Sequence, residues 1–220
     1  MHHRHAHQTA PGTRGITIHW AKAYDRRLAL LEILTFGRVR EIRTMMIEKA
    51  GLKSGDQVLD VGCGPGYVTL MAKQRVGPRG RAVGIDAAPE MIEAARQKAQ
   101  RTDLDVEFKV DLIEKLSFPD NSFDAVLSSL MMHHLPDDLK REGLAEVRRV
   151  LKPGGCLMIV DMKRPESWLG RALQSVIMHR SMPVGVQDLG ALLQETGFER
   201  IEPGNTRVKM IGYVRGYVRK

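Results

Sequence analysis

Cysteine is scarce in this sequence: its 220 residues include only Cys63 and Cys156. The two stand far apart and match no zinc-ligand spacing, and two thiols cannot form the disulfide framework of a small secreted domain. We therefore predict neither a disulfide scaffold nor a metal site. The low cysteine content favours a reducing, cytoplasmic setting.

Long apolar runs are also missing. No stretch approaches the length needed to span a bilayer, and residues 1–15, MHHRHAHQTAPGTRG, lack the apolar core of a signal peptide. We therefore expect a soluble protein. The histidines of this segment are interrupted by Arg4 and Ala6 and followed by Pro11 and Gly12, a composition that favours a disordered tail over a metal-binding tract.

The net charge of +8 is distributed unevenly. Residues 1–55 hold ten basic and four acidic side chains, residues 56–150 hold 13 and 16, and residues 151–220 hold 11 and six. Basic ends can attract an anionic substrate, a membrane surface or nucleic acid, but the same excess is common on an ordinary solvated surface. Charge alone therefore assigns no partner.

Strands and helices are predicted to alternate from residue 57 onward. The predicted strands are QVLDVG, RAVGID, DVEFKV, FDAVLSS and, after a tight KPGG turn, CLMIVD. Helices are predicted over residues 67–75, from Pro89, over residues 136–150, around residues 169–179 and around residues 188–196. Two closing strands, near residues 200–203 and 208–218, are expected to form an antiparallel hairpin through a Gly-Asn turn.

This alternation predicts an α/β fold with a Rossmann-like, seven-stranded, mostly parallel sheet. An antiparallel terminal strand and helices on both faces complete it. Apolar residues at helical spacing predict two helices between Trp20 and Ala50, with Gly37 as a joint. We therefore divide the chain into a tail (1–15), an N-terminal helical lid (16–50) and a cofactor domain (51–220), with Trp20 and Tyr24 in the lid.

A glycine-rich loop follows the first predicted strand. It reads Asp60-Val61-Gly62-Cys63-Gly64-Pro65-Gly66, and its glycines let the backbone approach a ligand at the carboxyl end of the strand. The spacing G-x-G-x-G differs from the G-x-G-x-x-G of dinucleotide sites, and a glycine loop alone is weak evidence. A nicotinamide-dinucleotide protein therefore stays as an alternative.

Two carboxylates end the next two predicted strands. Asp86 is placed to accept ribose hydroxyls, and Asp111 to accept an adenine amino group. Each also has an ordinary structural explanation: Asp86 as a helix cap before Pro89, and Asp111 as a turn residue. Their placement at successive strand ends favours the functional interpretation.

Four segments together resemble the motifs of class I S-adenosylmethionine-dependent methyltransferases. They are VLDVGCGPGYVT, GIDAAPEMI, DNSFDAVLSSLMMHHL and RRVLKPGGCLMIVD, within residues 40–165. The resemblance implies that Asp60 and the loop glycines (Gly62, Gly64 and Gly66) hold the methionine portion of S-adenosylmethionine. It further implies that Asp86 holds the ribose, that Asp111 and Leu112 hold the adenine, and that Ser129 lines the cofactor. Cys63, Ala87 and Met91 complete the expected cofactor-binding set.

Within this class the sequence is most similar to the ubiquinone and menaquinone biosynthesis C-methyltransferases, through AYDRRLALLEILTFGRVREIR and SFPDNSFDAV. It departs from them at His133 and His134, where those enzymes carry arginine and asparagine. The stretch between Asp161 and Asp188 is also too short for their substrate cover. Arsenite methyltransferases need more cysteines than this chain has, and SSLMMH lacks the Asn-Pro-Pro-aromatic signature of nucleobase amino-methyltransferases.

We therefore expect C- or O-methylation of a small, apolar or aromatic acceptor. His133 and His134 are candidate bases, although either can simply cap the strand or pack beneath Pro136. The methionines Met45, Met46, Met131, Met132, Met178 and Met182 are expected mainly in the core rather than in an acceptor pocket. The alternatives are an RNA or protein methyltransferase using the basic ends and a cofactor-binding protein without chemistry. Nucleic acid is the less favoured partner, membrane-surface contact is not required, and the sequence sets no oligomeric state.

Overall fold

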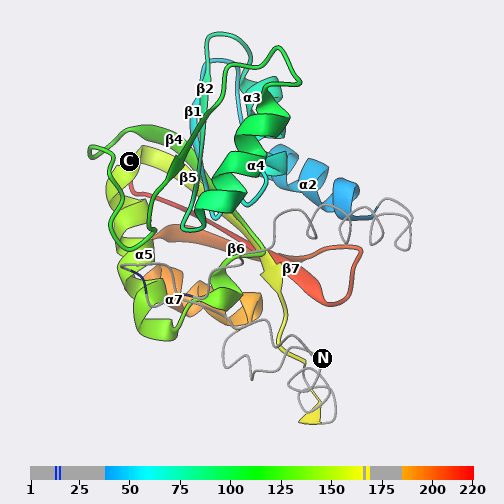
Figure 1. The fold of residues 1–220 in the computed structure, drawn as a ribbon. Coiled ribbons are helices and arrows are strands. Elements are labelled where there is room, and N and C mark those ends of the chain that lie inside the picture. Colours follow the sequence, from blue (N-terminus) through cyan, green and yellow to red (C-terminus); the bar gives the residue numbers. More distant parts are fainter. Residues whose placement is uncertain (1–12, 14, 16–37, 166, 169–184) are drawn as a thin grey trace, which may run out of the picture.

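Seven strands make one sheet in the computed structural model, which describes residues 13, 15, 38–165, 167, 168 and 185–220 (Figure 1). The helices are α2 (Arg38–Lys49), α3 (Tyr67–Val76), α4 (Pro89–Ala99), η1 (Met132–His134), α5 (Asp137–Val150), η2 (Val186–Asp188) and α7 (Leu189–Glu195). The strands are β1 (Gln57–Val61), β2 (Arg81–Asp86), β3 (Glu107–Val110), β4 (Phe123–Ser129), β5 (Leu151–Met162), β6 (Glu199–Asn205) and β7 (Ile211–Tyr217).

The order of strands across the sheet is β3-β2-β1-β4-β5-β7-β6. Only β7 runs antiparallel to its neighbours, β5 and β6. The predicted fold class is therefore confirmed. The antiparallel strand β7 lies between β5 and the edge strand β6. This insertion departs from the order 3-2-1-4-5-6 of the dinucleotide-binding fold.

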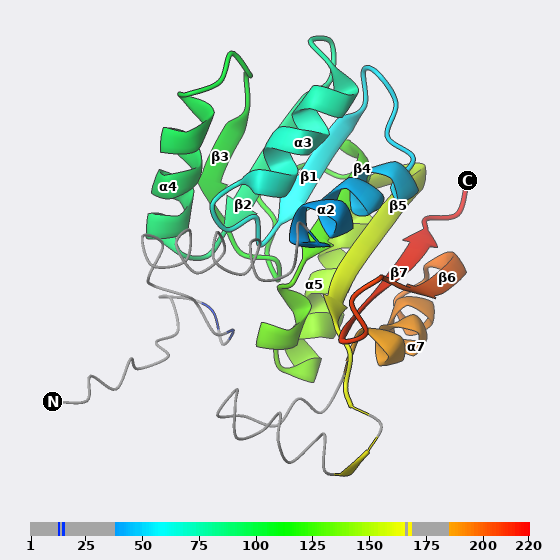
Figure 2. The same cartoon turned by 90° about the vertical axis from the view of Figure 1, so that its right-hand side faces the viewer.

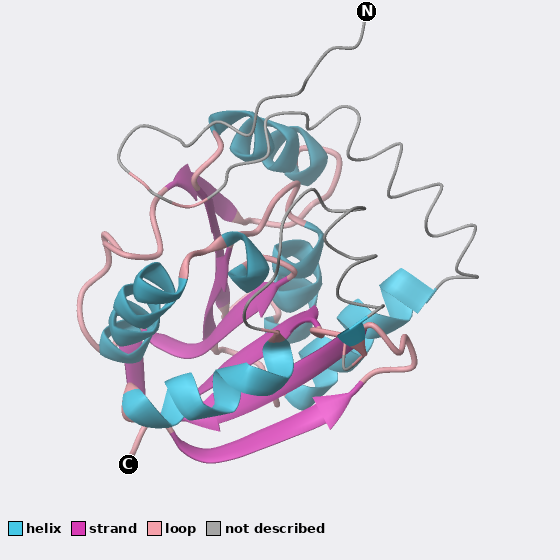
Figure 3. Cartoon of the chain, turned by 90° about the horizontal axis from the view of Figure 1, so that it is seen from below, coloured by secondary structure: helices cyan, strands magenta, loops and turns pink. Residues whose placement is uncertain are grey.

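Helices cover both faces of the sheet (Figures 2 and 3). On one face α2 and α3 pack on β1, β4 and β5 through a cluster that includes Met46, Ala72 and Leu127. On the other face α5 and α7 pack on the sheet through Leu144, Val147 and Leu193. Because β1 lies at the centre of the sheet and is buried, its sequence is mostly apolar, as predicted for a buried strand.

Two details of the predicted chain path were wrong. Gly204 and Asn205 lie inside β6, and the connection to β7 is the longer segment 206–210. The KPGG segment lies within β5, beside a register shift in the pairing of β4 with β5, rather than in a turn before the strand. At Gly204 and Asn205, pairing with Tyr213 and Gly212 of β7 overrides the local turn propensity of glycine.

Several predictions lie outside the described residues. The first lid helix, Tyr24 and the helix around residues 169–179 belong to this group, as do Met178 and Met182. The second N-terminal helix is confirmed as α2 over its described residues, Arg38–Lys49. None of the helices in the described ranges has the length and apolar character needed to cross a membrane.

Candidate functional site

A cavity of about 320 Å³ lies where the carboxyl ends of β1, β2 and β4 meet α2 and the loop after β3. Most of the predicted site residues line it: Asp60, Gly62, Cys63, Gly64, Asp86, Ala87, Met91, Asp111, Leu112, Ser129 and His134. Gly66 and His133 are not among its lining residues. This is the position at which open α/β sheets bind ligands.

The loop between β1 and α3 holds its glycines in left-handed backbone conformations. The φ angles are +70° at Gly62, +51° at Gly64 and +81° at Gly66. A Cβ added at Gly62 would lie 2.2 Å from Cγ of Met131, whereas one at Gly64 would meet no atom within 4 Å. Gly64 thus leaves bare backbone beside the cavity, where a ligand can approach closely.

Gly66 has a packing role. A Cβ at this position would lie 2.7 Å from Cζ of Phe108. Phe108 belongs to β3 and packs with Cys63 and Ile92 under the loop. The absence of a side chain at Gly66 therefore lets α3 begin close to β3.

Asp60 is a buried carboxylate at the floor of the cavity, with 1% of its surface exposed. Its Oδ2 accepts a hydrogen bond from the Thr69 hydroxyl at 2.6 Å, while its Oδ1 has no hydrogen-bond partner in the described part of the chain. Burial raises the pKa of Asp60 to about 7, against the lowering effect of the Thr69 bond. An unpaired buried carboxylate oxygen is costly unless a ligand supplies a donor.

Asp86, the last residue of β2, organises the glycine loop. Its Oδ2 accepts the Gly64 amide and its Oδ1 accepts the Ala88 amide, each at 2.9 Å. Burial raises the pKa of Asp86, and these amide bonds oppose the shift. Asp86 does not cap α4, whose N-cap is Ala88 without a side-chain cap bond, so the interpretation of Asp86 as a helix cap was wrong. Each oxygen keeps acceptor capacity toward the cavity.

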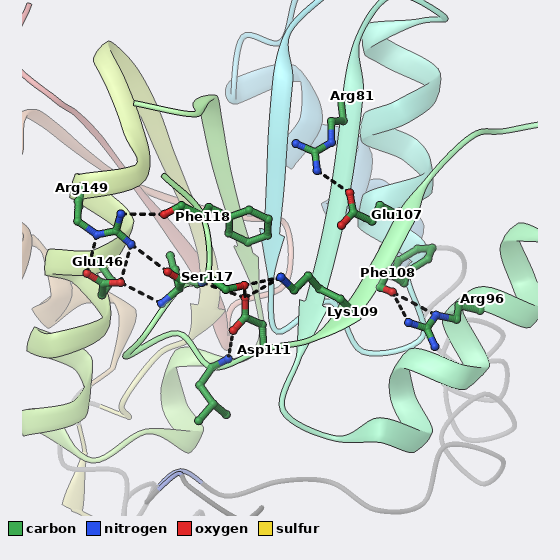
Figure 4. Close-up of polar contacts among 12 residues, drawn as sticks. Arg81, Arg96, Glu107, Phe108, Lys109, Asp111, Ser117, Phe118, Glu146 and Arg149 are labelled. Atoms are coloured by element: carbon green, nitrogen blue, oxygen red, sulfur yellow. Dashed lines mark hydrogen bonds and ion pairs between the residues drawn. The ribbon is translucent and has the colours of Figure 1, made fainter. Parts of the chain in front are cut away.

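Asp111 lines the cavity, but its carboxylate is largely engaged by its own loop (Figure 4). Oδ1 accepts the Leu112 amide at 3.1 Å, and Oδ2 accepts the amide of Ser117 at 3.2 Å and its hydroxyl at 2.6 Å. The turn function foreseen for Asp111 is therefore present. Its contact with adenine stays a prediction.

The two histidines occupy different environments although their ring centroids are 4.0 Å apart. His134 lines the cavity. The side chain of His133 is 8% exposed, and its Nδ1 lies 2.6 Å from Oδ1 of Asp161. Oδ2 of Asp161 accepts the His133 backbone amide at 3.1 Å, so Asp161 fixes the turn that carries both rings.

Sequence reasoning missed several lining residues. Arg43 and Ile42 reach the cavity from α2, Tyr67 from the first residue of α3, Glu114 from the loop after β3, and Met131 from the segment after β4. Arg43 ends the segment AYDRRLALLEILTFGRVREIR and Tyr67 lies in VLDVGCGPGYVT, but neither residue was predicted to be at the site. The docking of α2 beside α3 brings both to the cavity. Met46 and Met132 are core residues as expected, while Met131 is at the cavity.

Comparisons with known proteins agree with this geometry. A family model described as a methyltransferase domain matches residues 58–155. An arsenite methyltransferase of Halobacterium salinarum is 34% identical over 157 residues, which cover 70% of this chain and 40% of that protein. A demethylmenaquinone methyltransferase of Staphylococcus aureus is 32% identical over 164 residues, which cover 74% of this chain and 66% of that protein.

A solved structure of similar fold is an S-adenosylmethionine-dependent methyltransferase from Aquifex aeolicus. It matches with a TM-score of 0.67 and 26% identity, covering 80% of this chain and 89% of that one. The present chain spans less than two thirds of the length of the two curated relatives. By sequence and fold, the chain belongs to the class I S-adenosylmethionine-dependent methyltransferases and lies close to the quinone methyltransferase group.

Proposed function

We propose that this chain transfers a methyl group from S-adenosylmethionine to a small, apolar or aromatic acceptor by in-line displacement. The observation that carries the proposal is the buried Oδ1 of Asp60, which has no hydrogen-bond partner among the described residues and lies in a cavity that also has an apolar wall. The cationic amino group of S-adenosylmethionine can donate a hydrogen bond to the Asp60 carboxylate, and an apolar acceptor can pack against the apolar wall.

The residues of the cavity fit the cofactor of the family. Asp60 would hold its ammonium group, and the bare backbone at Gly62 and Gly64 would take the methionine portion. Asp86 would accept the ribose hydroxyls with its remaining lone pairs, with Ala87 and Met91 beside it. Asp111 and Leu112 would border the adenine, and Cys63 and Ser129 would line the remaining surface.

When bound, S-adenosylmethionine supplies a methyl group already activated on its sulfonium. The chain then needs mainly to hold the acceptor in line and to exclude water, and such orientation can contribute about 7–11 kcal/mol to the barrier reduction. An apolar wall of the cavity can hold an acceptor and exclude water. It consists of Val39, Ile42, Met131, Leu135 and Ile211. Their character supports an apolar or aromatic acceptor.

The thiols do not suit arsenite, which the Halobacterium relative is named for. Burial raises the pKa of Cys63 well above its usual value and that of Cys156 to about 12. Both thiols are therefore protonated at neutral pH and poor ligands for arsenic. Only two are present in the whole chain.

For an acceptor that must lose a proton, we propose His134 as the base, because it lines the cavity. His133 is the second candidate from the sequence, and its imidazole is held by Asp161. We assign His133 a positioning function, since its ring packs against that of His134 within the turn that Asp161 fixes.

Isothermal calorimetry with S-adenosylhomocysteine tests the proposal. We expect binding by the full chain, and Asp86→Ala should weaken it at least about tenfold, since hydrogen bonds to a charged group contribute about 1.5–3 kcal/mol. Asp103→Ala, at an exposed carboxylate that does not line the cavity, is the matched control. No uptake by the folded protein, or equal affinity of both variants, would contradict it.

The acceptor class is tested with methyl-labelled S-adenosylmethionine and cell extract, followed by mass spectrometry. We expect label in a small apolar or aromatic product. Label in RNA or protein, with binding that weakens steeply with salt, would support the alternative acceptor class instead. A melting temperature raised by NADH rather than by S-adenosylmethionine would support a dinucleotide protein.

A further inference from the structure

We propose that a basic surface beside the apolar wall of the cavity docks the protein on an anionic lipid surface. We call this surface the edge patch, and it consists of Arg38, Lys163, Arg207, Lys209 and Met210. The inference goes beyond the proposed function, because docking requires no chemistry. Where the proposed function holds, docking would bring the cavity to an apolar acceptor dissolved in the lipid.

The connection between β6 and β7 lies at the carboxyl edge of the sheet, on the same side as the cavity. β7 runs between β5 and β6 (Figure 2), and Ile211, its first residue, pairs with Met162 at the end of β5. The Lys163 amide donates to the Met210 carbonyl at 2.8 Å. Because Ile211 lines the cavity, the connection 206–210 lies directly beside the apolar wall.

Helix α2 brings a second basic segment to this place. Arg207 Nη1, in the connection, lies 2.5 Å from Oε1 of Glu41 on α2. Arg38 is exposed and lies three residues before Glu41, a spacing that puts both on one face of the helix. Val39, next to Arg38, lines the cavity. Basic residues from segments far apart in the sequence thus meet at the cavity wall.

The edge patch stays basic after its ion pairs are counted. Among the described residues, Glu41 is the one carboxylate that pairs with its four cations, whereas Lys163 donates to the uncharged side chain of Asn205. The Arg207 side chain is 80% exposed despite its pair, so lipid phosphates can reach the guanidinium. Lys209 is exposed as well. Charge complementarity therefore favours an anionic partner.

The exposed apolar side chain of the edge patch favours lipid over nucleic acid. Met210 is 56% exposed although it lies between Lys209 and the cavity residue Ile211. At a lipid surface the apolar side chain enters the acyl boundary while the cations meet anionic headgroups. A nucleic acid would use the cations and leave Met210 in water. The apolar path from Met210 to the cavity wall also suits an acceptor that arrives from lipid.

Vesicle flotation with the full chain tests the inference. We expect binding to phosphatidylcholine vesicles that contain phosphatidylserine, no binding to pure phosphatidylcholine, and weaker binding as salt rises. Arg207→Gln with Lys209→Gln should lower the partition coefficient about 25-fold, since each cation near such a surface contributes about fivefold.

A matched double variant controls for net charge. Arg219→Gln with Lys220→Gln removes the same charge beyond the far end of β7, which pairs with β5 at Cys156. Arg219 is 82% exposed and lies 3.9 Å from a carboxylate, that of Glu199, much as Arg207 lies beside Glu41. We expect this variant to keep the partition coefficient within about twofold of the unaltered protein, because its charges lie away from the docked edge.

Met210→Ser tests the apolar contribution. It should lower the partition coefficient about three- to tenfold at low and at high salt alike, because the loss is apolar rather than electrostatic. Calorimetry with S-adenosylhomocysteine is the second measurement. Its affinity should be the same in Met210→Ser and in the unaltered protein, since Met210 does not line the cavity.

Each failure has its own signature. Absence of binding to phosphatidylserine vesicles at low salt would overturn the inference, as would equal weakening by the two double variants. Binding to single-stranded RNA that depends on Arg207 and Lys209, without vesicle binding, would assign the edge patch to nucleic acid instead. Failure to bind S-adenosylhomocysteine would contradict the proposed function and leave the vesicle result to decide docking on its own.

Discussion

Asp60 favours ligand binding at the expense of stability in the ligand-free protein. Burial raises its pKa to about 7 from a usual value of 3.8, so the folded state holds a proton on this group that the unfolded chain releases at lower pH. The stability from the neutral carboxyl is therefore fully present below pH ~4. It is lost as the pH rises toward and through 7.

We expect Asp60→Asn to raise the melting temperature at pH 8 and to change it little at pH 5. The amide removes a buried charge but can still accept the Thr69 hydrogen bond. One kcal/mol corresponds to about 2–4 °C in a domain of this size. Scanning calorimetry at both pH values measures the effect, with Asp103→Asn as the control. An equal decrease in the melting temperature of Asp60→Asn at pH 5 and pH 8 would contradict the prediction.

The histidine pair gives a second prediction at the residue scale. For an acceptor that must lose a proton, His134→Gln should lower kcat by about 10²–10⁴-fold, the usual contribution of a general base, with little change in affinity for S-adenosylhomocysteine. His133→Gln should lower kcat less and should lower the melting temperature, because it breaks the bond to Asp161. Steady-state rates measured as a function of pH distinguish the effects of the two substitutions. Equal rates for His134→Gln and the unaltered protein would show that His134 is not the base.

At the scale of elements, the loop between β3 and β4 depends on α5 (Figure 4). Arg149 donates to the carbonyls of Phe118 at 2.8 Å and Leu116 at 3.0 Å, and it pairs with Glu146. Oε2 of Glu146 in turn accepts the Leu116 amide at 2.9 Å. The helix thereby holds the loop that brings Asp111 to the cavity.

Arg149→Ala should therefore destabilise the protein by about 1–3 kcal/mol, because it leaves two partly buried carbonyls unpaired. It should weaken S-adenosylhomocysteine and methylthioadenosine alike, since the loop borders the predicted adenine site. Arg148→Ala is the control, because its Nε makes one long bond of 3.3 Å to the Gly197 carbonyl. Denaturant unfolding and calorimetry measure both effects, and selective loss of one ligand would be inconsistent with this function of the loop.

At the scale of the whole molecule, the N-terminal segment meets the cavity. Thr13 and Gly15, from the segment expected to be a tail, are among its lining residues, and a Cβ at Gly15 would lie 3.0 Å from Leu135 Cδ2. Thr13 and Gly15 thus contribute to the site.

Deletion of residues 1–35 should spare the fold and lower substrate turnover severalfold, in keeping with a lid. Circular dichroism melting and turnover with the labelled cofactor measure the two properties. Deletion of residues 1–10 keeps Thr13 and Gly15 and is the control. Unchanged substrate turnover after deletion of residues 1–35 would contradict the prediction that this segment forms a lid.

Most strands and helices could be predicted because their signals are local. The apolar run of β1, Pro89 at the start of α4 and the spacing of the loop glycines each reflect the conformation or burial of a few neighbouring residues. The hairpin turn was misplaced because strand pairing extended β6 through Gly204 and Asn205. The turn propensity of glycine and asparagine does not indicate whether these residues pair with another strand.

The sequence by itself determined the order of elements, the glycine loop and the carboxylates at the strand ends, because a parallel sheet brings those ends to one edge. Only the tertiary structure decided how each group is used. It engages Asp111 in its own loop and leaves Asp60 Oδ1 without a hydrogen-bond partner among the described residues. It also brings Arg43 and His134, but not His133, to the lining of the cavity. The physical reason is that the cavity is assembled from segments distant in the chain, and that burial depends on how those segments pack, which no local pattern encodes.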